Sequence, residues 1–175
     1  HLNKSDSQYY NTTESAAARW READLPTPTK DIRRMRTDLQ RWGYCLISEA
    51  LSKSQLAAMR DRVVEQAAGE REGGIALWLN ASSNGSNTQF VTTLLNKGDV
   101  FEGALNFDST YVQAGPVMEQ LLTEALGGDF LINSFQAIIA HQHNFPQALH
   151  QDDIGSAPYR HPEAPLLVTA MFMLD

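Results

Sequence analysis

The chain has 175 residues, enough for about one domain, and its 42% hydrophobic and 20% charged residues are typical of a globular protein. A net charge of −7 excludes a general attraction to nucleic acid or to an anionic membrane, and no apolar run is long enough to span a bilayer. Cys45 has no second cysteine with which to form a disulfide, and the N-terminus lacks an apolar signal core, so we expect a reducing, cytoplasmic location.

The N-terminal part of the chain predicts an arm followed by helices. Residues 1–29 are polar and end in a Pro-rich stretch, which is typical of an arm or linker. Apolar residues then recur at helical spacing from Ile32 to Trp42, and Gly43 follows as a helix stop. Tyr44–Ile47 predicts a short buried strand.

A capping box at Ser52–Gln55 predicts the next helix, which should run to about Glu70. Two strands are predicted after it, at Ile75–Leu79 and Gln89–Leu95.

The C-terminal half predicts one more helix and then strands. Gly115-Pro116 opens the helix, with proline in the first turn, and Gly127-Gly128 stops it. Phe130–Ala140 predicts a long strand, and the continuous apolar run Leu166–Leu174 predicts a strand covered on both faces. Helices gathered before strands favour the α+β class, with helices packed on one face of a sheet.

The stretch that carries chemistry is Gln147-Ala148-Leu149-His150-Gln151-Asp152. If it is extended, residues two apart point to the same face, so His150 and Asp152 can hold one metal ion. With a second histidine they make the facial triad of non-haem Fe(II) oxygenases. The pair alone also fits a polar strand end, because His-x-Asp is short enough to recur by chance.

Three stretches resemble the phytanoyl-CoA dioxygenase-like family of Fe(II)- and 2-oxoglutarate-dependent oxygenases. They are Asp38–Tyr44 leading to Leu51-Ser52, Leu121–Gly127 followed by the strand from Phe130, and Gln147–Asp152 followed by Leu166–Asp175. Together they cover roughly residues 31–175.

The resemblance implies a double-stranded β-helix, the jelly-roll or cupin-like fold, with the N-terminal helices packed on one sheet. Residues 30–175 would form the N-terminal part of a single oxygenase-like domain that is incomplete at the C-terminus. The second iron-binding histidine and the arginine that pairs with 2-oxoglutarate lie on later strands in the family. We therefore expect a further segment or a partner subunit to complete the barrel.

The resemblance also implies roles for individual residues. His150 and Asp152 would hold Fe(II). Asp153 is the less favoured alternative to Asp152 and is read instead as a solvated turn residue. Gln147 is either a contact to the cosubstrate 2-oxoglutarate or a strand-end glutamine bonded to the backbone. Gln136 is either a pocket residue that contacts the cosubstrate or a structural strand residue.

The expected reaction is oxidation of a C–H bond by O2 in a small-molecule substrate. A small metabolite or natural product is favoured, since no basic cluster suits a CoA phosphate. The alternative is a non-catalytic, β-rich binding or assembly subunit of the same fold.

Other polar residues have simpler interpretations. Asn96 and Lys97 are read as loop residues, although family members often contact cosubstrate or substrate there. His141 and His143 have metal-ligand spacing, but without a matching carboxylate they are read as surface histidines. His161 lies in a Pro-rich loop and is read as a bystander. Cys45 is read as a core residue.

Overall fold

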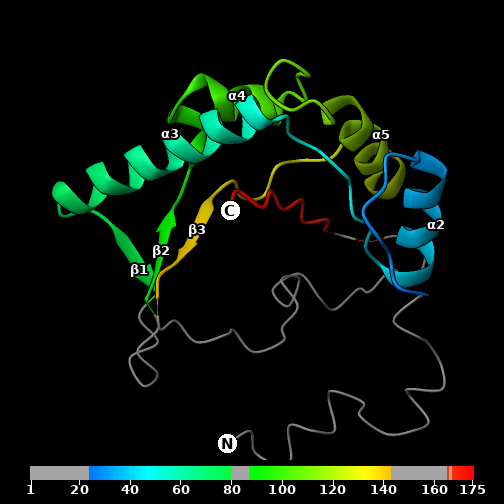
Figure 1. Ribbon diagram of the computed structural model, residues 1–175, viewed down its shortest axis with the longest axis horizontal. Helices are drawn as coiled ribbons and strands as arrows, with labels where there is room; N and C mark the ends of the chain where they lie inside the picture. The colour runs from blue at the N-terminus through cyan, green and yellow to red at the C-terminus, as the bar shows by residue number, and fades with distance from the viewer. Residues whose placement is uncertain (1–23, 80–86, 143–164, 166) are drawn as a thin grey trace, which may run out of the picture. The chain divides into compact units, whose positions relative to one another are not determined.

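The structure is a computed structural model that describes residues 24–79, 87–142, 165 and 167–175 (Figure 1). These residues fall into two compact units divided between Ser48 and Glu49. The described residues combine helices with one three-stranded antiparallel sheet, in agreement with a mixed α and β class. The double-stranded β-helix stays a prediction. No described helix is long and apolar enough to cross a membrane.

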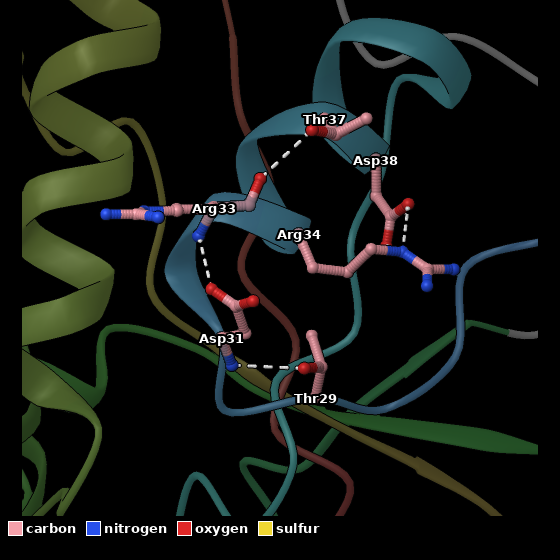
Figure 2. Close-up of polar contacts among 6 residues, drawn as sticks. All are labelled: Thr29, Asp31, Arg33, Arg34, Thr37 and Asp38. Carbon is pink, nitrogen blue, oxygen red and sulfur yellow. Dashed lines mark hydrogen bonds and ion pairs between the residues drawn. The ribbon is translucent and has the colours of Figure 1, made fainter.

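The first unit is built on helix α2, Ile32–Trp42, which begins and ends where the sequence predicts. Its N-cap is Asp31, whose carboxylate accepts a hydrogen bond from the Arg33 backbone N–H at 2.9 Å. The helix ends at Gly43 in the left-handed conformation, φ 76°, which glycine adopts without a steric penalty. Figure 2 shows the N-cap and, one turn later, the Arg34 guanidinium beside the Asp38 carboxylate.

The strand predicted at Tyr44–Ile47 is not formed. The only pairing there is an isolated parallel bridge between Thr29 and Ile47, supported by hydrogen bonds from Thr29 N to Leu46 O and from Ser48 N to Thr29 O. A strand needs a partner over several residues, and Thr29 supplies a single contact before α2 begins.

In the second unit, α3 spans Lys53–Glu72 and begins at the predicted capping box. The Ser52 hydroxyl accepts from Gln55 N at 3.2 Å, and the Gln55 side chain accepts from Ser52 N at 2.9 Å. Gln55 also binds the connection after helix α4 (Asp99–Leu105), because its amide donates to the carbonyls of Ser109 and Thr110, both at 2.9 Å. The capping residue therefore joins two parts of the chain as well as starting a helix.

The sheet contains β1 (Leu77–Leu79), β2 (Thr88–Val91) and β3 (Ala137–Ala140) in the order β1-β2-β3, all antiparallel. Directly paired residues share a face, and Trp78, Gln89 and Ile139 lie in one row. The Gln89 amide donates to Ala67 O of α3 at 3.0 Å, so this face, the helix-covered face, packs on α3. The far face carries the alternate residues Leu77, Leu79, Phe90 and Ile138.

All predicted strands are shorter than expected or absent. β2 ends at Val91 because Thr93 adopts φ 53°, and the 3₁₀ helix η3 follows at Leu94–Asn96. Only the last four residues of Phe130–Ala140 pair with β2. Residues 167–174 of the predicted strand Leu166–Leu174 carry no strand assignment, since they join no ladder among the described residues.

Two further helices connect β2 to β3. The short α4, Asp99–Leu105, is not predicted from the sequence, whereas α5, Gly115–Leu126, starts at the predicted Gly-Pro. In the core of the second unit α3 contacts both α4 and β2, and α4 contacts η3. The buried side chains of this unit include Met59, Val63, Val91, Leu94, Phe101, Val112 and Leu121.

Candidate functional site

The residues predicted to bind iron lie outside the described residues. His150 and Asp152, together with Gln147, fall in the stretch 143–164. His143 and His161 fall there too. Their assignment as metal ligands or bystanders therefore stays a prediction from the sequence.

Gln136 is the one predicted cosubstrate residue that the structure describes. It directly precedes β3 and its side chain is exposed. Side chains alternate along an extended chain, so Gln136 belongs with Ile138 on the far face. Its neighbour Phe135 points the other way, because its ring meets the ring of Phe101 edge-on at 6.1 Å.

The backbone beside Gln136 is fixed from the helical side. Leu94 N, at the start of η3, donates to the Phe135 carbonyl at 3.1 Å. Phe101 is only 1% exposed, so the Phe135 ring packs against a rigid part of the core. These contacts hold the segment while leaving the Gln136 amide on the far face.

The far face is apolar around this amide. Leu77 is 53% exposed and Ile138 is 52% exposed, although both lie in the sheet. Apolar walls with a few polar groups are typical of sites that bind small molecules. The far face can thus provide an apolar lining with Gln136 as a polar contact at its edge.

Lys97 lies elsewhere. Its ammonium contacts the Glu70 carboxylate of α3 at 2.5 Å, and the Gln66 amide donates to the same carboxylate oxygen at 3.1 Å. Burial raises the pKa of Glu70. The hydrogen bonds from Lys97 and Gln66 and the charge of Lys97 lower this pKa by more than burial raises it, so it lies below its ordinary value. Lys97 is thus more than a loop residue, because its ammonium is paired with a carboxylate of α3.

His141 is not the surface histidine that the sequence suggested. Its ring packs against the indole of Trp78 with centroids 5.4 Å apart, and its Nε2 is buried without a hydrogen-bond partner. Two residues beyond Ile139, it alternates onto the helix-covered face, which is opposite Gln136.

The pairing of Lys97 with Glu70 is the contact that sequence reasoning missed. The two residues are 27 positions apart, and nothing local marks them as partners. The described residues contain no group of three or more histidine, cysteine or acidic side chains that could hold a metal. The imidazole of His150 and the carboxylate of Asp152 nevertheless have the chemistry that suits Fe(II), and they would supply two of the three protein ligands of a facial triad.

Comparison with models of known protein families gives a match. A family model described as Phytanoyl-CoA dioxygenase (PhyH) matches residues 39–175. Neither curated proteins nor solved structures gave a match to the chain. The matched range includes the sheet, Gln136 and the whole of Gln147–Asp152.

Proposed function

The chain belongs to the phytanoyl-CoA dioxygenase family, and we propose that it is an Fe(II)- and 2-oxoglutarate-dependent oxygenase of a small metabolite or natural product. The observation that carries the proposal is the family match over 39–175, which includes the His-x-Asp stretch. Members of this family are dioxygenases, so the kind of enzyme follows from the family, whereas the reaction and substrate are our inference.

In this proposal His150 and Asp152 hold the iron. A neutral imidazole and a carboxylate are suitable ligands for Fe(II), and a second histidine would complete the triad. The bound ion would supply O2 activation coupled to the oxidative decarboxylation of 2-oxoglutarate. Protons compete with the metal for the imidazole, so iron affinity should fall in acid.

Gln147 and Gln136 orient the cosubstrate. The side-chain amide of each can donate hydrogen bonds to a carboxylate oxygen of 2-oxoglutarate. The position of Gln136 at the edge of an apolar sheet face supports this role, because an amide there can be reached by a ligand lying on that face. The apolar side chains of the far face would bind the substrate's carbon skeleton and exclude water.

The iron site can be tested without turnover. Under anaerobic equilibrium dialysis, the complete wild-type protein, including the segment or subunit that completes the barrel, should bind one Fe(II) per chain. His150→Ala and Asp152→Ala should each weaken iron binding more than the loss of an outer-shell partner does, which is typically about 10–100-fold.

The control is His161→Ala, which removes an imidazole from a loop that the sequence predicts to be uninvolved. It should leave iron binding unchanged. Equal binding by wild type and His150→Ala would contradict the proposed ligand set.

A further inference from the structure

A hollow of about 390 Å³ lies where α3 ends and β1 begins, lined by Arg71, Gly74, Ala76 and Trp78. Trp78 belongs to the helix-covered face of the sheet. The hollow is therefore on the side of the sheet opposite Gln136 and plays no part in the proposed oxygenase site.

Arg71 is held in this hollow by a buried partner. Its Nη1 donates to Gln89 Oε1 at 2.6 Å, and Gln89 is 0% exposed. The Gln89 amide nitrogen donates to Ala67 O, which fixes the amide and so fixes the acceptor that Arg71 uses. The guanidinium is oriented before any ligand arrives.

The charge of Arg71 has no carboxylate partner among the described residues. Its hydrogen bond to Gln89 uses one of the five N–H donors of the guanidinium and leaves the positive charge unneutralised, because the Gln89 amide is neutral. The partial negative charge at the C-terminus of α3 is unfavourable for an anion in this hollow. It amounts to only about half an elementary charge, whereas the guanidinium carries a full positive charge. Charge and geometry thus favour an oxyanion, which arginine can bind through two parallel hydrogen bonds.

The other walls of the hollow suit a flat apolar group. The Trp78 ring contacts the ring of His141, with centroids 5.4 Å apart, and forms one wall of the hollow. Gly74 adopts φ +70°, and a Cβ built on it would meet nothing within 4 Å, so the hollow is open at its Gly74 wall. An aromatic body can lie on the indole while its charged group reaches Arg71.

We propose that this hollow binds a small aromatic oxyanion, with the carboxylate or phosphate on the Arg71 guanidinium and the ring on Trp78. The two oxyanions share one recognition chemistry, and the probes below distinguish them. The proposal does not depend on iron or 2-oxoglutarate, so its failure would leave the proposed oxygenase function untouched.

The test follows the indole N–H signals of the protein's three tryptophans by two-dimensional ¹H–¹⁵N NMR, with Trp78→Phe to identify the Trp78 signal. Benzoate and phenyl phosphate are titrated separately, without iron, beside the neutral analogue benzamide and inorganic phosphate. Benzoate, phenyl phosphate or both should move the Trp78 signal saturably. The absence of any saturable shift, or an equal shift with benzamide or with inorganic phosphate, would overturn the proposal.

Two variants of α3 assign the binding to Arg71. Arg71→Gln should lower the affinity for the probe by about tenfold or more, since it removes a charge-assisted contact. Arg60→Gln removes the same charge from an exposed site on the same helix and should change nothing. Arg71→Lys keeps the charge but not the paired donors and should bind between wild type and Arg71→Gln. Equal affinity in Arg71→Gln and Arg60→Gln would contradict a specific role of Arg71.

Discussion

The ion pair between Lys97 and Glu70 connects the end of η3 to α3 through charges that are largely removed from water. The Glu70 side chain is 7% exposed and that of Lys97 is 23% exposed. A buried pair stabilises little by itself, but removing one member leaves the other charge without its counter-ion. The pair therefore matters for the position of η3, whose Leu94 N–H fixes the carbonyl next to Gln136.

Lys97→Met should destabilise the protein by about 1–3 kcal/mol at neutral pH, because among the described residues Glu70 then keeps Gln66 alone as a side-chain hydrogen-bond donor. The folded pKa of Glu70 lies below its ordinary value of 4.5, so the pair's contribution is present above about pH 4.5 and is lost as the pH falls through the folded pKa. The difference between wild type and variant in urea unfolding should accordingly shrink in acid.

The matched control is Arg60→Met, which breaks an exposed pair with Asp61 on the same helix. This variant should stay within about 0.5 kcal/mol of wild type. A Lys97→Met protein as stable as Arg60→Met at pH 7 would show that the pair does not hold η3 in place.

At the scale of elements, the connection between β2 and β3 packs through glycines. A Cβ on Gly103 of α4 would lie 2.1 Å from the ring of Tyr111. A Cβ on Gly115, at the start of α5, would lie 2.2 Å from the backbone oxygen of Phe107, which cannot rotate away. At Gly103 and Gly115, α4 and α5 thus approach their neighbours more closely than a residue with a side chain would allow.

Gly103→Ala should destabilise the protein by about 1–3 kcal/mol through overpacking against Tyr111. Gly69→Ala is the control, because it adds the same methyl group at an exposed position of α3 where nothing lies within 4 Å. The Gly69→Ala substitution should stabilise the protein by about 0.5–1 kcal/mol, since alanine is more favourable than glycine in a helix interior. Thermal unfolding followed by circular dichroism measures both, and similar midpoints for the two variants would refute the close packing of α4.

Helices were predictable from the sequence because their signals are local. Ser52 and Gln55 cap α3, Gly43 ends α2, and Pro116 opens α5, each within a few residues of the helix it defines. The seven-residue α4 has no side-chain cap and gave no such signal. Strand lengths depend on distant partners, which an apolar run such as Phe130–Ala140 does not encode.

For the whole molecule, the sequence was sufficient to recognise the family and to suggest its iron ligands. The match over 39–175 confirms the family, and it spans the division between the two units at Ser48. Burial and long-range pairing were not predictable, as the buried Nε2 of His141 and the pairing of Lys97 with Glu70 both illustrate. The roles of His150 and Asp152 stay predictions that only a metal-dependent measurement can test.

The most direct test of the oxygenase proposal is the visible charge-transfer band that Fe(II) and 2-oxoglutarate give when both bind at one site. Under anaerobic conditions, the complete wild-type protein, including the segment or subunit that completes the barrel, should develop this weak band with Fe(II) on addition of 2-oxoglutarate, with saturation, and His161→Ala should do the same. His150→Ala should give no band. The absence of a band in wild type, or an unchanged band in His150→Ala, would contradict the account.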